Sequence, residues 1–258
     1  MKLNTNNNAY IIIYSAILVI IVAFLLAFVF KALKPMQDRN VELDRKKQVL
    51  YALNIRNLDG AEAEAKYNEI IEDEVDFMGQ KILMAEIDGE SIMVFGMKGM
   101  GLWGGISGYM SARLDPEKGG FVVYGAYFNH ESETAGLGAE IKDSQAWQEK
   151  FIGKRIIGQD EKGEDKVVLS IVKKVEDPET QVDCVTGATL TSNGVDEMIK
   201  RTFGLWTGEY DFDMDESELK TMLIKCFLGK DSVCDAELEK MLKIKKVKML
   251  KIKKVEEK

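Results

Sequence analysis

The sequence predicts an α+β protein in which a single transmembrane helix precedes an antiparallel sheet with flanking helices. An unbroken apolar run covers residues 10–30, and short β-type runs at 82–87, 91–95 and 121–127 are separated by turn sequences. Helical patterns lie before and after this group of strands, which favours helices packed to one side of an antiparallel sheet.

The composition argues against several classes of function. The chain has 258 residues, a formal charge of -8 and a pI of about 5.0, which disfavours a nucleic-acid partner. Its three cysteines form neither a CxxC pair nor an even set, so neither a disulfide framework nor a zinc site is indicated. His130 is the only histidine, which leaves little material for a histidine-based triad or metal site. We therefore expect no metal site and no catalytic side chain, and assign the chemistry to a bound cofactor.

Residues 1–34 form the predicted tail and membrane anchor. The apolar run from Tyr10 to Phe30 is long enough to cross a bilayer, which takes about 20 residues. A cleaved signal peptide would have an apolar core of about 7–15 residues and an Ala-x-Ala-like cleavage site, and no such site precedes Lys31. The sequence therefore predicts a retained single-pass anchor.

Residues 35–78 form a predicted juxtamembrane helical segment. Charged residues and spaced apolar residues from Met36 to Asn57 indicate an amphipathic helix, and an Ala- and Glu-rich stretch from Ala61 to Glu72 indicates a second one. We favour a stalk that packs on the following domain; the alternative is a separate device for binding a partner.

Residues 79–210 form the predicted globular domain. Besides the three strands, it contains a predicted helix and turn at 147–157, a strand at 167–175 and a helix at 195–203. The sequence from Gly99 to Gly104 has the form GxGxxG, but a dinucleotide fingerprint also needs a following helix and an acidic residue about 20 positions on. Further glycines and a turn follow instead, so we reject a Rossmann-type site.

The most informative stretch is 183–192, with the sequence DCVTGATLTS. Its small residues Gly187 and Ala188 keep the backbone thin, and the N–H groups at the start of a following helix favour an anion. The residues alone leave an alternative open, in which the stretch is a turn and helix cap. Ser192 or Asn193 would then be the N-cap, and Glu197 would complete a capping box.

The pattern Asp-x-x-Thr-Gly-Ala-Thr-x-Thr at 183–191 resembles the flavinylation motif of the FMN-binding domain family. In that family a separate transferase takes FMN from FAD and esterifies it, through its phosphate, to the Thr after Gly-Ala. The resemblance implies a covalent FMN on Thr189, with cofactor-binding neighbours Asp183, Thr186, Gly187 and Ala188.

Two other stretches resemble the same family. The sequence KGMGLW at 98–103 implies that Trp103 lines the pocket of the isoalloxazine ring, although a buried core Trp is the alternative. The sequence ETAGLG at 133–138 resembles Glu-Thr-Pro-Gly-Leu-Gly, with Ala135 in place of Pro, and the alternative is an acidic surface loop. Backbone N–H groups around Gly136 would bond flavin carbonyls. The implied cofactor-binding residues of this stretch are Glu133, Thr134, Gly136, Leu137 and Gly138.

The span and the linker at 34–55 resemble the C subunits of sodium-translocating NADH:quinone oxidoreductases. The resemblance implies a subunit that relays electrons from NADH towards ubiquinone through its FMN and is inactive alone. It implies the other subunits of the complex and a flavin transferase as partners. The G subunits of Rnf complexes are the alternative family. A membrane-anchored interaction module with an unmodified Thr189 is the alternative from another class.

The resemblance also implies a bacterial inner membrane, with the flavin domain on the periplasmic side. The charges around the span indicate the opposite, because cations cluster after residue 30 and few precede the span, and the positive-inside rule puts such a cluster in the cytoplasm. We follow the family resemblance, since it rests on a specific motif.

Residues 211–258 form an acidic and then Lys-rich extension. The sequence MLKIKKV occurs twice, at 241–247 and 249–255. It is typical of a basic amphipathic tail, to which we assign no function.

Overall fold

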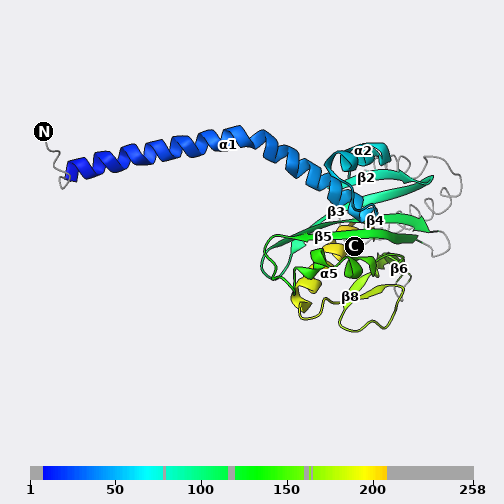
Figure 1. Cartoon of the computed structure of the whole chain (residues 1–258). Coiled ribbons are helices and arrows are strands. Elements are labelled where there is room, and N and C mark those ends of the chain that lie inside the picture. Colours follow the sequence, from blue (N-terminus) through cyan, green and yellow to red (C-terminus); the bar gives the residue numbers. More distant parts are fainter. Residues whose placement is uncertain (1–7, 78–79, 116–119, 160–162, 164, 208–258) are drawn as a thin grey trace, which may run out of the picture. The chain divides into compact units, whose positions relative to one another are not determined.

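The computed structural model describes residues 8–77, 80–115, 120–159, 163 and 165–207 (Figure 1). The predicted extension at 211–258 lies outside the described residues. The chain divides into two compact units, Met1–Lys46 and Lys47–Lys258.

The first unit consists mainly of helix α1, which begins at Asn8 and continues to Ala52 in the second unit. Its apolar side chains between Ile11 and Phe30 are exposed, and the helix is long and apolar enough to cross a membrane. The expected apolar helix is therefore present. The predicted juxtamembrane helix is not a separate element, because α1 runs through Pro35 without a break.

The last turn of α1 is fixed to the sheet of the second unit. The buried Ser111 hydroxyl donates a hydrogen bond to the Ala52 carbonyl over 2.5 Å. The Asn54 side chain donates to the Tyr124 carbonyl over 2.7 Å. A Cβ at Gly125 would lie 2.4 Å from the Ala52 oxygen, so only glycine permits this approach.

Helix α2 (Gly60–Ile70) begins with a capping box. The Glu62 N–H donates to the Asp59 side chain, and the Glu62 side chain accepts from the Asp59 N–H. The helix ends at Ile70, because the next residue begins a strand. The predicted helix at 61–72 is thus correct for most of its length.

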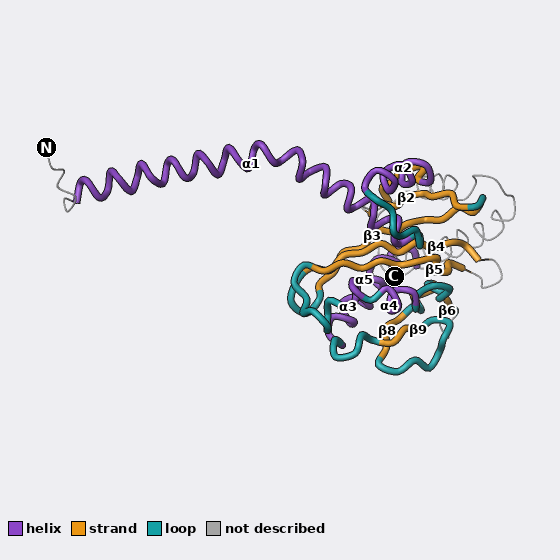
Figure 2. Tube along the Cα trace, viewed as in Figure 1, coloured by secondary structure: helices purple, strands orange, loops and turns teal. Residues whose placement is uncertain are grey.

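Five antiparallel strands follow one another in chain order and form the main sheet (Figure 2). The three predicted strands are present, and two more that were not predicted complete the sheet, at its β1 edge and between β3 and β5. The strands are β1 (Ile71–Phe77), β2 (Gln80–Ile87), β3 (Glu90–Met100), β4 (Gly105–Asp115) and β5 (Gly120–His130).

Both faces of the sheet carry a hydrophobic core. Successive strand residues point to opposite faces, so Phe95 packs in one core and Val94 in the other. The Phe95 core includes Phe203 of the C-terminal helix, whereas the Val94 core includes Leu50 of α1 and Tyr67 of α2. The α+β class is confirmed, but helices cover both faces and not one.

The rest of the domain consists of short elements and one long helix. The helices are α3 (Glu140–Asp143), α4 (Gln145–Glu149) and α5 (Thr189–Thr207), and the strands are β6 (Ile157–Gln159), β7 (Asp165–Val167), β8 (Ser170–Val172) and β9 (Gln181–Asp183). Strands β8 and β9 are parallel to each other. Strand β9 ends where the flavinylation-like motif begins, and α5 starts inside that motif.

Candidate functional site

The motif forms a short loop between β9 and α5. The Ala188 N–H donates to the Val185 carbonyl over 3.0 Å, and Gly187 has a φ of 77°, which favours glycine. Helix α5 begins at Thr189, six residues before the predicted start at Val195. The suggested caps at Ser192 and Asn193 are therefore wrong.

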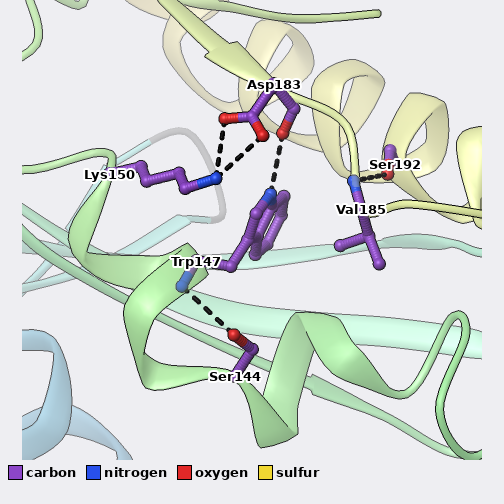
Figure 3. A network of polar contacts seen from close by, with 6 residues as sticks. All are labelled: Ser144, Trp147, Lys150, Asp183, Val185 and Ser192. Carbon is purple, nitrogen blue, oxygen red and sulfur yellow. Dashed lines mark hydrogen bonds and ion pairs between the residues drawn. The ribbon is translucent and has the colours of Figure 1, made fainter.

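Ser192 has a different role from the suggested helix cap. Its side chain is fully buried, and its hydroxyl oxygen accepts a hydrogen bond from the Val185 N–H over 3.0 Å (Figure 3). The hydroxyl thus fixes the loop that precedes the helix. The Ser192 hydroxyl is therefore engaged with the loop before α5 and does not cap a helix.

The hydroxyl groups of the motif differ in their access to solvent. Thr191 is only 1% exposed and donates to the Glu133 carboxylate over 2.6 Å. Thr186 is exposed and Thr189 is half-buried. Thr189 therefore stands at the first residue of α5 with its surface partly open, whereas Thr191 and Ser192 are enclosed.

Asp183 is held by the segment that contains α4 (Figure 3). The Lys150 ammonium lies 2.9 and 2.8 Å from the two carboxylate oxygens of Asp183. The buried Trp147 donates its indole N–H to the Asp183 carbonyl over 2.8 Å. Asp183, which the sequence suggested as a cofactor-binding residue, thus anchors the start of the loop to α4.

Glu133 connects the candidate segments to one another. One carboxylate oxygen accepts from the Trp103 N–H over 2.8 Å, and the other accepts from the Thr191 hydroxyl over 2.6 Å. The side chain is only 8% exposed. Glu133, which the sequence placed in the wall of a cofactor pocket, is therefore a buried link between the β3–β4 turn and α5.

The Glu133 carboxylate is stabilised in its ionised form. Its burial raises the pKa, but the hydrogen bonds from Thr191 and from the Trp103 and Leu102 backbone lower it by more. The pKa of Glu133 consequently lies below its usual value, and the group carries a negative charge at neutral pH.

Glycines allow the three segments to approach closely. A Cβ at Gly101 or Gly138 would lie 2.4 or 2.3 Å from a Glu133 carboxylate oxygen. A Cβ at Gly194 would lie 2.2 Å from the Met100 carbonyl oxygen. A Cβ at Gly187 would lie 2.8 Å from the Leu137 side chain, so Leu137 rests against the motif loop.

Exposed apolar side chains come from these same segments. Trp103 is 66% exposed, which excludes the alternative of a buried core Trp. The others are Leu102 beside it, Leu137, and Leu190, which directly follows Thr189. Exposed apolar side chains on segments that meet one another can provide contact for an aromatic ring.

The 133–138 stretch forms a turn with most of its surface exposed. Gly136 has a φ of 72°, and the Leu137 and Ala139 N–H groups both donate to the Thr134 carbonyl. The Leu137 amide is thus used within the turn. The role of amide donors towards a cofactor stays a prediction for Gly136 and Gly138.

The sequence did not identify Lys150, Trp147 or Leu190 as site residues. Lys150 lies 33 positions before Asp183, and no local pattern around it predicts the contact. Leu190 did carry a signal, because it is an apolar residue among the hydroxyl residues of the motif, and the structure leaves it 60% exposed.

Comparisons with known proteins agree on one family. The profile of the FMN-binding domain matches residues 101–203. Among the C subunits of Na(+)-translocating NADH-quinone reductases, that of Neisseria meningitidis is 32% identical over 168 residues, which is 64% of this chain and 55% of the relative. That of Haemophilus ducreyi is 27% identical over 79% of this chain and 92% of the relative.

A solved structure extends the likeness to three dimensions. The crystal structure of the same subunit from Parabacteroides distasonis has a TM-score of 0.57 and 33% identity, and the alignment covers 66% of this chain and 93% of that one. This chain therefore belongs to the family of Na(+)-translocating NADH-quinone reductase C subunits.

Proposed function

We propose that this chain carries one FMN, esterified through its phosphate to the Thr189 hydroxyl, and relays electrons as a subunit of a sodium-translocating NADH:quinone reductase. The observation that carries the proposal is that the three family-like segments meet, at Glu133 and where Leu137 lies against the loop before the half-buried Thr189. The FMN-binding domain match, at 101–203, includes residues of all three segments.

The described residues fit an FMN at this place. Thr189 is the first residue of a 19-residue helix that has no acidic residue in its first turn. The free N–H groups at such a helix start favour the remaining phosphate charge. The exposed side chains of Leu102, Trp103 and Leu137 provide apolar contact for an aromatic ring.

Burial supports Thr189 over its neighbours as the acceptor. Thr191 donates its hydroxyl to Glu133 and is almost completely enclosed, so a transferase cannot reach it without opening the site. Thr186 is exposed but lies in the loop before the helix. Thr189 combines access with a place at the helix start. It is also the Thr after Gly-Ala, to which the family motif assigns the acceptor role.

Attachment requires FAD and a separate flavin transferase. The Thr189 oxygen forms a bond to the FMN phosphorus of FAD, and the anhydride bond to the AMP half breaks. The hydroxyl proton is released, and AMP leaves with the electron pair of the broken bond. The chain contributes the acceptor and its surroundings, and bound FMN supplies one- and two-electron redox chemistry.

The cellular setting follows from the anchor and from the relatives. The exposed apolar part of α1 supports a membrane-anchored subunit of the bacterial inner membrane. We place the flavin domain on the periplasmic side, where covalent attachment prevents loss of the cofactor. The other subunits of the complex are the expected partners, and electrons pass from NADH towards quinone through the assembly. The relatives belong to the reductase, which favours this complex over Rnf.

The test is flavin fluorescence of the full-length chain made together with its flavin transferase. We expect a fluorescent band near 29.0 kDa on a denaturing gel, and we expect Thr189→Ala to abolish it. Ser91→Ala, which removes an exposed hydroxyl outside the three segments, is the control and should retain the band. A dark wild-type band, with a transferase that modifies a control substrate, would overturn the proposal.

A further inference from the structure

The loop before Thr189 is held at its start by residues outside the family motif. Lys150 reaches both oxygens of the Asp183 carboxylate, and Trp147 reaches the Asp183 carbonyl (Figure 3). Both side chains come from one segment, which lies more than 30 positions earlier in the sequence.

This segment provides a rigid base for the contact. Trp147 is buried and packs its ring against Phe128 and Phe151, with centroids 5.6 and 5.1 Å apart. The Ser144 hydroxyl oxygen caps α4 by accepting from the Trp147 N–H over 3.3 Å. Lys150 follows α4 directly, so its ammonium is directed at Asp183 from a fixed position.

The other end of the loop is fixed by α5. Ser192 accepts from the Val185 N–H, and Ala188 bonds back to the Val185 carbonyl. The chain between Asp183 and Thr189 is thus fixed by the contacts of Asp183 at its start and by the hydrogen bonds to Ser192 and from Ala188 towards its end. The hydrogen bond to Ser192 is buried, whereas the ion pair between Lys150 and Asp183 is exposed.

We propose that Lys150 is a positioning residue for flavin attachment, which acts by holding Asp183 so that the loop presents Thr189 to the incoming flavin phosphate. The inference rests on the proposed function. Lys150 acts through the loop and makes no bond in the transfer itself, in which a bond from the Thr189 oxygen to phosphorus replaces the anhydride bond of FAD.

The exposure of the ion pair separates this role from a role in folding. The Lys150 and Asp183 side chains are each 45% exposed. Such pairs contribute little to stability, because water screens them and two long side chains lose freedom. Loss of Lys150 should therefore leave the melting temperature nearly unchanged while the loop samples more conformations, which slows the transfer.

The experiment measures the rate of flavin attachment to the full chain with purified transferase and FAD. Lys150→Ala should lower the maximal rate about two- to fivefold, the range expected when one exposed ion pair is lost. Lys150→Arg should restore most of it, because a guanidinium also reaches the carboxylate. Lys142→Ala, which removes an exposed lysine outside the network, should attach flavin at the wild-type rate.

The pairing with Asp183 is tested in the same assay. Lys150→Ala should have no further effect in a chain that already carries Asp183→Asn, because both changes break one contact. Effects that multiply would overturn the inference, as would a wild-type rate in Lys150→Ala. A loss confined to the apparent KM would also overturn it, since Lys150 would then contact the transferase.

The outcomes separate this inference from the proposed function. A wild-type chain that accepts no flavin overturns both. A wild-type chain that accepts flavin on Thr189, with Lys150→Ala equally fast, overturns only the positioning role. Melting temperatures of the unmodified chains, which we expect to agree within about 2 °C, show that a slower variant is still folded.

Discussion

At the scale of single residues, the site depends on one buried carboxylate. Glu133 accepts hydrogen bonds from two segments that lie 30 and 58 positions away in sequence. Gly101 and Gly138 leave room for the carboxylate, and a side chain at either position would clash with it. Its observed role is therefore in the arrangement of the segments.

Removing this carboxylate should destabilise the domain. In Glu133→Ala the buried Thr191 hydroxyl loses its acceptor, which costs about 1–3 kcal/mol in the free energy of unfolding. Glu133→Gln should cost less, because its amide oxygen still accepts one of the two hydrogen bonds. Urea unfolding of the full chain measures both, and Glu131→Gln at the exposed neighbouring position is the control. Equal stability of Glu133→Ala and wild type would contradict the proposed link.

The contribution of Glu133 should also depend on pH. Its pKa is lowered in the folded state, so the folded chain binds fewer protons than the unfolded chain in the acidic range. The stabilisation is fully present above the unfolded pKa of about 4.3 and is lost as the pH falls through the lower folded pKa. The stability difference between wild type and Glu133→Gln should be constant near pH 7 and shrink below about pH 4. A difference that grows on acidification would contradict this sign.

The sequence was most informative where the chemistry is local. Nine consecutive positions predicted Thr189 as the acceptor and small residues before it, and the structure leaves Thr189 half-buried at the start of α5. The contacts of Glu133 and Asp183 were not predictable in the same way. Both residues were assigned to a cofactor, but their carboxylates bond to groups that only the folded chain brings near.

At the scale of elements, the first turns of α5 pack directly on the end of β3. Gly99 and Gly194 allow this contact, since a Cβ at Gly99 would lie 2.9 Å from Met198 and one at Gly194 would meet the Met100 carbonyl. The position of Thr189 relative to the β3–β4 turn is set by these backbone approaches.

Gly194→Ala should therefore destabilise the domain, although alanine is normally the better helix residue. The added methyl group would lie 2.2 Å from a backbone oxygen that cannot rotate away, and such overpacking costs about 1–3 kcal/mol. Gly96→Ala is the matched control, because its methyl group would make an ordinary 3.5 Å contact with the Tyr109 ring. Thermal unfolding should show a lower melting temperature for the first variant only.

Two errors of prediction at this scale have a common cause. Strand β4 was missed because glycine and serine interrupt its apolar pattern, and glycine is depleted in strands. The start of α5 was placed too late because hydroxyl residues usually mark a cap and not a first turn. In both places tertiary contacts decide the conformation: pairing with two neighbouring strands for β4, and the bonds of Thr191 and Ser192 for α5.

At the scale of the whole molecule, the orientation in the membrane can be decided by labelling. We expect a cysteine at the exposed position Lys173 to react with an impermeant reagent in intact cells, because we place the domain in the periplasm. A cysteine at Thr5, before the single span, should react only after lysis. The background carries Cys184→Ala, Cys226→Ser and Cys234→Ser. The reverse pattern would favour the positive-inside rule and a cytoplasmic domain.

Within the main sheet each of the five strands pairs with its neighbours in the chain, and β5 also forms a bridge from Val122 to Arg155. Such local pairing lowers the average sequence separation of contacts, and chains of this kind reach the native state quickly. Helix α5 comes from the end of the described chain and needs the finished sheet for its packing. The native surroundings of Thr189 thus require α5 to be packed on the finished sheet. A transferase that needs these surroundings would attach flavin to folded domains and leave unfolded chains unmodified.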